Sequence, residues 1–254
     1  MILDNFRLDG KVALVTGAAQ GLGQGMALGL AEAGADIVAL DRCANDETGD
    51  QVTKLGRRFS QQCVDLRQAS VVDLQEAVAF TVRALGRIDI LINNAGIIRR
   101  APALDFSEQD WDDVLQINLK AAFFLSQAAA REMVKQGGGK IISIASMLSF
   151  QGGVIVPSYT AAKSGIAGIT RALANEWAKY HINVNAIAPG YMATENTAPI
   201  RADAQRSQTI LERIPAGRWG TPSDLQGVVV FLASSASDYM HGAIVPVDGG
   251  WLAR

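Results

Sequence analysis

The chain has 254 residues, of which 49% are hydrophobic, and its formal net charge is −2. This length and apolar content allow one large α/β domain with a substantial core. The near-neutral charge gives no broad positive field of the kind that attracts nucleic acid or an anionic membrane. No apolar run reaches the roughly 18 residues of a membrane span, and the first residues lack the long apolar segment of a signal peptide. We therefore expect a cytoplasmic protein that binds a small molecule, with neither nucleic acid nor membrane as a partner.

The cysteines and histidines argue against a disulfide framework and a metal site. Two cysteines, Cys43 and Cys63, are too few for such a framework and suit a reducing compartment. The two histidines, His181 and His241, lie far apart in the sequence and have no cysteine cluster beside them. A zinc site therefore has no visible set of ligands, and we predict no metal.

Apolar, β-branched runs alternate with helix-forming segments along nearly the whole chain. In the first part we predict strands at 11–16, 36–40, 59–64 and 88–93, with helices at 22–33 and 70–85. In the second part we predict strands at 140–145, 182–187 and 243–247, with a long helix at 158–179. This alternation is typical of βαβ units. It predicts one domain over 1–254, a Rossmann-type, doubly wound parallel α/β sheet of about seven strands with helices on both faces.

One long segment, 193–216, fits none of these strands. It is rich in polar residues and is bracketed by Pro189 and Pro215. Long segments of this kind beside a site are often functional, so we predict a mobile substrate lid here.

A glycine-rich turn, T-G-A-A-Q-G-L-G, directly follows the first predicted strand. Its glycines permit a tight bend and let backbone N–H groups approach a pyrophosphate at the start of the next helix. The residues expected to bind a dinucleotide here are Thr16, Gly17, Gln20, Gly21, Leu22 and Gly23. At the end of the second strand, Asp41 can accept hydrogen bonds from the ribose hydroxyls of NAD and would repel a 2′-phosphate. The neighbouring Arg42 could instead pair with that phosphate or simply be exposed.

Tyr159 and Lys163 lie four residues apart in the long predicted helix, so their side chains share one face. A tyrosine holds its proton at neutral pH, but a nearby ammonium and an oxidised nicotinamide stabilise the phenolate. Tyr159 can then take a proton from an alcohol, or return one to a ketone. Ser146 follows a predicted strand at the edge where open α/β sheets bind ligands, and its hydroxyl can hold the substrate oxygen.

The glycine turn, the N-N-A-G segment 93–96 and the order Ser146, Tyr159, Lys163 resemble the short-chain dehydrogenase/reductase family over essentially the whole chain. The resemblance implies an NAD-dependent oxidoreductase that acts on CH–OH groups, and a homotetramer. It implies that Asn118 anchors a water leading from Lys163 to solvent. Gln20 stands where NADP-using members often carry a basic residue, which favours NAD. The further cofactor-binding residues that the resemblance implies are Asp65, Leu66, Asn93, Ala95, Gly96, Pro189, Gly190 and Thr194.

Several segments, among them the terminal D-G-G-W-L-A-R, are similar to a narrower group, the bacterial 2-dehydro-3-deoxy-D-gluconate 5-dehydrogenases of uronate breakdown. This implies interconversion of 2-dehydro-3-deoxy-D-gluconate and its 2,5-diketo form. Such a sugar acid carries a carboxylate, and Arg99 or Arg100 follows N-N-A-G closely enough to bind it. Both arginines could equally be solvated or serve a subunit contact. Met147 and Gln151 are further substrate candidates by position.

Three alternatives remain at this point. The substrate could be 2-deoxygluconate or gluconate, or the chain could be a 3-oxoacyl-carrier-protein reductase. The last would be expected to prefer NADPH and to present basic patches to its carrier, and Asp41 argues against that preference. A dinucleotide-binding regulator without catalysis is the non-enzyme alternative, which the complete set of Ser146, Tyr159, Lys163 and Asn118 disfavours.

Overall fold

A computed structural model describes residues 1–42 and 46–254 of the chain. Cys43 therefore lies outside the described residues, whereas Cys63 has a free, exposed thiol. In the described part of the chain, seven strands form one sheet in the order β3-β2-β1-β4-β5-β6-β7, and every neighbouring pair is parallel. The strands are β1 (Val12–Thr16), β2 (Asp36–Asp41), β3 (Phe59–Cys63), β4 (Ile90–Asn93), β5 (Gly139–Ile144), β6 (Ile182–Pro189) and β7 (Ile244–Val247). The predicted doubly wound sheet is confirmed.

The strand ends differ from the predicted ones by small amounts. The largest extension is at β6, which continues through Pro189, where Pro189 pairs with Val247 of β7. A proline has no N–H for the ladder, so the sequence pattern stops before it, but at the last residue of a strand this loss is tolerated. The next N–H, from Gly190, donates to the Val247 carbonyl at 2.9 Å.

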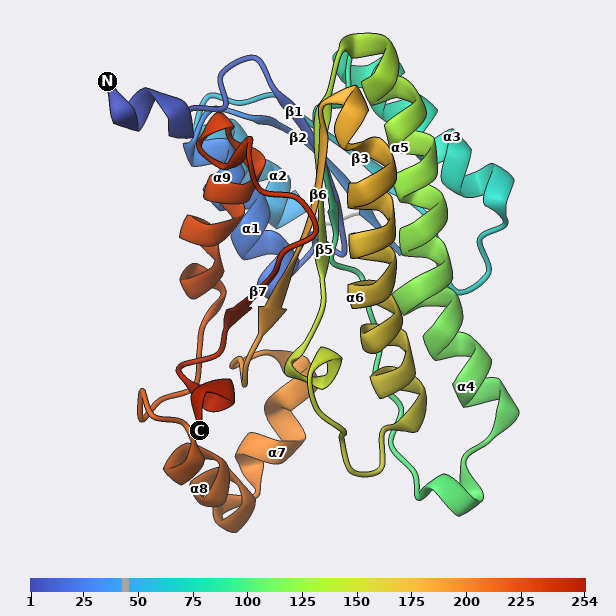
Figure 1. Cartoon of the computed structure of the whole chain (residues 1–254), viewed down its shortest axis with the longest axis vertical. Coiled ribbons are helices and arrows are strands. Elements are labelled where there is room, and N and C mark those ends of the chain that lie inside the picture. Colours follow the sequence, from blue (N-terminus) through green and yellow to red (C-terminus); the bar gives the residue numbers. More distant parts are fainter. Residues whose placement is uncertain (43–45) are drawn as a thin grey trace.

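Helices cover both faces of the sheet (Figure 1). One face carries α1 (Gly21–Glu32), α2 (Asp46–Lys54) and α9 (Gln226–Ala233), and the other carries α3 (Val71–Leu85), α4 (Glu108–Leu115), α5 (Ala122–Gln136) and α6 (Pro157–Trp177). Each layer has its own apolar core, because the strands are buried on both sides and point alternate residues to each. For example, Leu14 belongs to the core under α3 and α5, and Val15 to the core under α1 and α9.

The segment 193–216 folds into two helices, α7 (Ala198–Ala202) and α8 (Ala204–Arg213). They lie beyond the carboxyl ends of β6 and β7 (Figure 1). Ile210 and Ile214 pack with Met147 and Trp251 in a small separate apolar cluster. The segment is therefore attached by its own apolar contacts and, at its first residue, by the Ala193 N–H, which donates to the Gly220 carbonyl at 2.7 Å.

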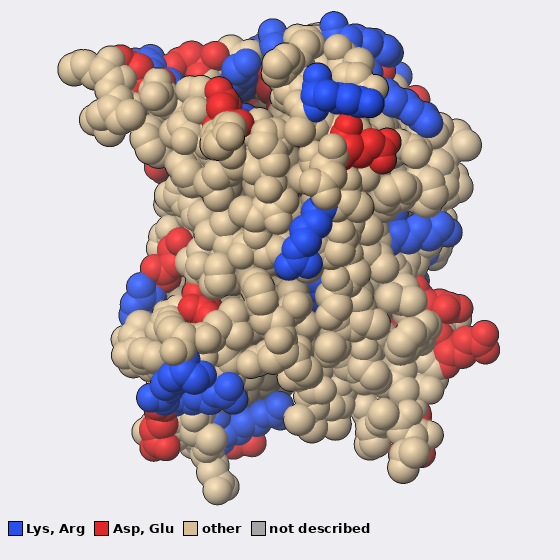
Figure 2. Space-filling view, in the orientation of Figure 1, with Lys and Arg blue, Asp and Glu red and all other residues tan. Residues whose placement is uncertain are grey.

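Charged side chains of both signs lie on the surface. On the face in Figure 2, lysines and arginines gather at the top and at the lower left, each group with aspartates or glutamates beside it, and single charged side chains lie between them. Among the described residues, no helix is both long enough and apolar enough to span a bilayer. Nor do the described residues include a group of three or more histidine, cysteine, aspartate or glutamate side chains placed to hold a metal ion.

Candidate active site

The glycine-rich turn joins β1 to α1 and leaves the start of that helix open. Gly17 and Gly21 have φ angles of +65° and +60°, in the left-handed region that glycine adopts without strain. A Cβ on Gly23 would lie 1.9 Å from the Gly17 carbonyl oxygen, so the turn can close only around a glycine. Gln20, the N-cap residue of α1, makes no side-chain capping bond. The first N–H groups of α1 thus fit the pyrophosphate of a dinucleotide.

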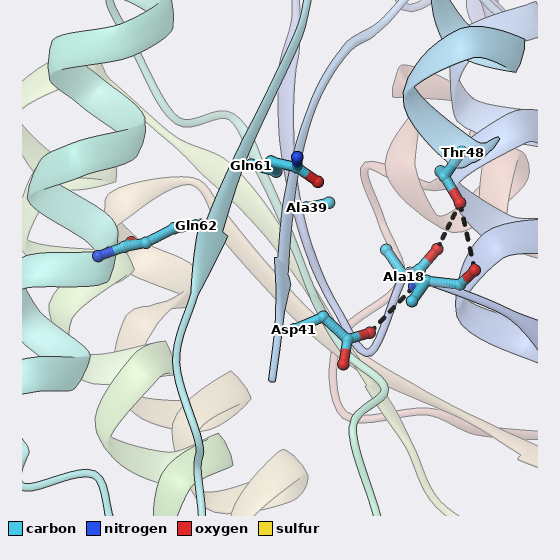
Figure 3. A pocket seen from close by; sticks show the side chains of 7 residues that line it. Ala18, Ala39, Asp41, Thr48, Gln61 and Gln62 are labelled. Carbon is cyan, nitrogen blue, oxygen red and sulfur yellow. Dashed lines mark hydrogen bonds between the residues drawn. The ribbon is translucent and has the colours of Figure 1, made fainter. Parts of the chain in front are cut away.

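Asp41 lies at the end of β2 and faces this turn (Figure 3). One carboxylate oxygen accepts the Ala19 N–H at 3.0 Å, and the other accepts the Arg42 N–H at 2.7 Å. Thr48 of α2 donates its hydroxyl to the Ala18 carbonyl at 2.9 Å and holds the turn from the other side. The pocket between them is lined by Ala18, Ala19, Ala39, Asp41, Thr48, Gln61 and Gln62. A carboxylate in this place fits ribose hydroxyls. Thr48 was missed because no sequence pattern ties it to the turn.

The N-N-A-G segment is clamped to the end of β1. The Thr16 hydroxyl accepts the N–H groups of Asn94 and Ala95, both at 2.9 Å, and donates to the Ile92 carbonyl. The Asn94 side chain donates to the Thr16 and Gly17 carbonyls at 2.9 and 3.1 Å. The buried Thr16 hydroxyl is thus occupied by protein partners, so this predicted cofactor residue serves to position the loop. Asn94 was not among the predicted site residues, although the motif contained it.

Three further predicted cofactor residues, Asn93, Asp65 and Leu66, differ in whether their side chains support the fold or are open to a ligand. The Asn93 amide is buried and donates to Ser126 at 2.9 Å and to Ser143 at 3.3 Å, so it braces β4 against its neighbours. Asp65 remains partly exposed at the carboxyl end of the sheet, where it accepts the Arg67 N–H at 3.0 Å. The side chain of Leu66 is in the core. Asp65 is therefore the one of these three with a side chain open to a ligand.

Ser146, Tyr159 and Lys163 come together at the carboxyl edge, where β5 ends and α6 begins. The Lys163 ammonium lies 5.5 Å from the centre of the Tyr159 ring. Burial raises the pKa of the Tyr159 phenol, while the Ser146 hydroxyl and the charge of Arg100 act in the opposite direction. The phenol is thus held protonated at neutral pH in the protein alone.

Lys163 is almost fully buried and donates to the Ile144 carbonyl at 2.6 Å. Burial disfavours its charged form and lowers its pKa from 10.5 to about 8. The Ser146 hydroxyl accepts the Leu148 N–H at 3.1 Å and keeps its own proton available for another acceptor. The site thus combines a protonated phenol, a hydroxyl donor and an amine whose charge changes near neutral pH.

Asn118 lies in a short π-helical turn, Gln116–Ala121, between α4 and α5. Its amide is buried and makes two bonds of 2.8 Å with the Ile97 main chain, one in each direction. The side chain predicted to anchor a water is therefore already paired. π-helical turns are rare and are frequent at functional sites.

The structure distinguishes the two arginines that the sequence left equivalent. Arg99 points toward α4, where its guanidinium lies 3.0 Å from Asp110 and 3.9 Å from Asp113. Arg100 instead donates to the Asn196 carbonyl at 3.3 Å and is close enough to Tyr159 to act on the pKa of its phenol. Of the two charges, that of Arg100 acts on the Tyr159 phenol, whereas that of Arg99 is paired with the acidic residues of α4. Arg100 is therefore the better placed of the two candidates for the substrate carboxylate.

The remaining predicted residues surround this centre. Met147 is buried in the apolar cluster under α8, and Gln151 follows on the adjoining loop. Gly190 packs against the Asp248 main chain, since a Cβ there would lie 2.5 Å from the Asp248 Cα. Thr194 begins the turn that leads into α7. Its methyl group lies close to the start of α1, because a Cβ built on Gly21 would be 3.9 Å from it. The cofactor side and the substrate side thus meet at the start of segment 193–216.

Comparisons with known proteins agree with this arrangement. Residues 17–252 match a family model described as Enoyl-(Acyl carrier protein) reductase. Over 257 residues the chain is 65% identical to the 2-dehydro-3-deoxy-D-gluconate 5-dehydrogenase of Escherichia coli strain K12, and the match covers 100% of both. A solved protein of Agrobacterium tumefaciens with bound NADP is 57% identical, with a TM-score of 0.92 over 98% of this chain and 99% of that one. A gluconate 5-dehydrogenase from Burkholderia cenocepacia, in complex with NADP and tartrate, is 40% identical, with a TM-score of 0.94 over 100% of both chains.

Proposed function

Because the chain belongs to the short-chain dehydrogenase/reductase family and is an oxidoreductase acting on a CH–OH group, we propose that it interconverts 2-dehydro-3-deoxy-D-gluconate and its 2,5-diketo form with NAD(H). The observation that carries this proposal is the 65% identity to the Escherichia coli enzyme over the full length of both chains. NADH consumption with a panel of C5- and C3-keto sugar acids tests it. Turnover of the 2,5-diketo acid far above the others is the expected result, and preference for another keto acid would contradict it.

In the proposed mechanism Tyr159 transfers the proton. A bound nicotinamide supplies the hydride to a ketone, or accepts one from an alcohol. Tyr159 gives its proton to the ketone oxygen in reduction and takes it back in oxidation, and the raised pKa of its phenol keeps that proton in place beforehand. Ser146 donates to the same oxygen and orients it toward the phenol. Lys163 supplies positive charge beside the phenolate that oxidation requires.

We propose Arg100 as the residue that binds the substrate carboxylate. A guanidinium can bind a carboxylate through two parallel hydrogen bonds, which a neutral side chain cannot match. Its present partner is a single main-chain carbonyl at 3.3 Å, a weak bond that a carboxylate can replace. Arg201 or Arg206 of segment 193–216 would be the next candidates if Arg100 failed. Met147 and Gln151 would complete the pocket.

We propose NAD as the preferred cofactor. The Asp41 carboxylate is held in place by two backbone N–H groups, can accept bonds from ribose hydroxyls, and would repel a 2′-phosphate. The Agrobacterium and Burkholderia structures contain NADP, which makes that cofactor the direct competitor. In a protein that uses NADP, Arg42 would pair with the phosphate.

The family resemblance supports a homotetramer, the cysteine content and the lack of a long apolar segment support a location in the cytoplasm, and the length and polar character of segment 193–216 support its role as the substrate lid. Light scattering on the purified protein measures the first of these. Gluconate and 2-deoxygluconate are the alternative substrates, and the gluconate 5-dehydrogenase from Burkholderia cenocepacia favours including both in the substrate panel. A carrier-protein reductase is less well supported, because it would be expected to prefer NADPH, and the Asp41 carboxylate opposes the 2′-phosphate of that cofactor.

A further inference from the structure

A side-chain contact joins the glycine-rich turn to segment 193–216. The amide of Gln20 donates to the Glu195 carboxylate at 2.8 Å, although the two residues are 175 positions apart in the sequence. Gln20 is the N-cap residue of α1, and Glu195 directly follows Thr194. Both side chains are exposed, so neither is needed to fill the core.

The turn that carries Glu195 is held on both sides. Arg100 donates to the Asn196 carbonyl at 3.3 Å, and Arg201 donates to the Thr194 carbonyl at 3.1 Å. The Thr197 hydroxyl donates to the Met192 carbonyl at 2.6 Å, which fixes the other end of the turn. Glu195 is therefore presented to Gln20 by an ordered turn rather than by a chance encounter of two long side chains.

The contact spans the part of the site that fits the middle of a dinucleotide. On one side are the first N–H groups of α1, which fit a pyrophosphate, and on the other is Thr194, which the family resemblance makes a cofactor-binding residue. The bond from Gln20 to Glu195 joins these two elements across that part of the site.

We propose that Gln20 and Glu195 form a clasp across the dinucleotide site, and that its opening is part of cofactor release. This inference rests on the proposed cofactor site. The two residues are positioning residues: they hold segment 193–216 against the glycine-rich turn and take no part in the proton transfer. Because this hydrogen bond is exposed, it is expected to slow cofactor release by roughly two- to tenfold.

The test is a double-mutant cycle on cofactor release, measured by stopped-flow fluorescence of NADH displaced from the purified full-length protein. The variants are Gln20→Ala, Glu195→Ala and the double variant. Each single change should speed release by several-fold, and the double variant should be no faster than the faster single one, since both remove the same bond. Glu195→Gln keeps an acceptor for the Gln20 amide and should restore much of the slow release.

The chain offers a matched control. Gln208 donates to Glu212 at 3.0 Å, and this exposed glutamine–glutamate pair lies within α8 rather than across the site. Gln208→Ala and Glu212→Ala should leave the NADH release rate within about twofold of the wild-type rate, as expected for an exposed helical pair. The proposal would be overturned if the Gln20 and Glu195 variants had additive effects on the NADH release rate, or no effect on it. Equal effects of the two control variants would overturn it as well.

A second measurement follows segment 193–216 itself. Trypsin can cleave after its exposed arginines, Arg201, Arg206 and Arg213. A closed clasp predicts that NADH slows this cleavage in the wild type but much less in Glu195→Ala. Equal protection in both proteins would contradict the proposal. Neither measurement contains a keto acid, so the substrate assignment can fail while the clasp is confirmed. If NADPH binds more tightly than NADH, the same cycle is run with NADPH.

Discussion

Replacing Arg100 with alanine separates the substrate interaction from simple surface charge. Charge-assisted bonds to a carboxylate contribute about 1.5 to 3 kcal/mol, which corresponds to a loss of roughly ten- to a hundredfold in kcat/KM for the keto acid. The amide of the same keto acid, which has no charge, should lose far less. Arg99→Ala is the matched control, because Arg99 differs by one position and its ion pair with Asp110 is about 40% exposed on both sides. An exposed pair of this kind contributes about 0 to 1 kcal/mol to stability and should leave the acid-to-amide ratio unchanged.

The same variant has a second readout that loss of binding alone would not produce. The charge of Arg100 lowers the pKa of the Tyr159 phenol, so its removal should shift the phenol pKa upward. In the oxidation direction, the pH at which activity rises should move to a higher value by the same amount. If Arg99→Ala and Arg100→Ala reduce the acid-to-amide ratio equally, or if neither does, the assignment of Arg100 is wrong.

Three further predictions concern the cofactor, a buried charge and the loop clamp. Asp41→Ala should lower the ratio of kcat/KM with NADH to kcat/KM with NADPH, because it removes the repulsion of the 2′-phosphate. A wild type that already prefers NADPH would contradict our assignment of Asp41. Burial lowers the pKa of Lys163 from 10.5 to about 8 in the folded protein. Between pH 8 and 10.5 the unfolded chain therefore binds more protons than the folded one, and this group makes the free energy of unfolding rise with pH. Urea unfolding at pH 7.5 and 9.5 should show that rise diminished in Lys163→Met; an unchanged pH dependence would contradict the burial of a neutral amine. Asn94→Ala leaves the carbonyls of Thr16 and Gly17 without their partner and should lower the free energy of unfolding by about 1 to 3 kcal/mol and weaken NADH binding, as measured by urea titration and fluorescence; no change in either would contradict the clamp.

The fold could be predicted from the sequence because its signals are local and repeated. Buried parallel strands have a continuous apolar pattern, as in Ile37 to Leu40, and glycine follows the ends of several elements, as at Gly17 and Gly86. The polar segment 193–216 was recognised as different, but not as helical. Its helices are short and depend on the contact of Ile210 and Ile214 with Trp251, a residue from the far end of the chain. No local pattern reports such a contact.

The site could be predicted in part for the same reason. Tyr159 and Lys163 share a helix, so their spacing alone places them together. Arg99 and Arg100 are adjacent in the sequence, and only the position of α4 decides that the first pairs with Asp110 while the charge of the second acts on the Tyr159 phenol. The bond between Gln20 and Glu195 likewise depends on how two distant segments meet.

Kinetics of Tyr159→Phe with the 2,5-diketo acid and NADH test the central claim most directly. The change removes the transferable proton and leaves the ring, so kcat should fall by at least about a hundredfold. NADH binding, followed by fluorescence, should stay within about twofold of the wild-type affinity, since no ring contact is lost. A variant that reduces the keto acid at near wild-type rates would show that another group supplies the proton, and the proposed mechanism would fail.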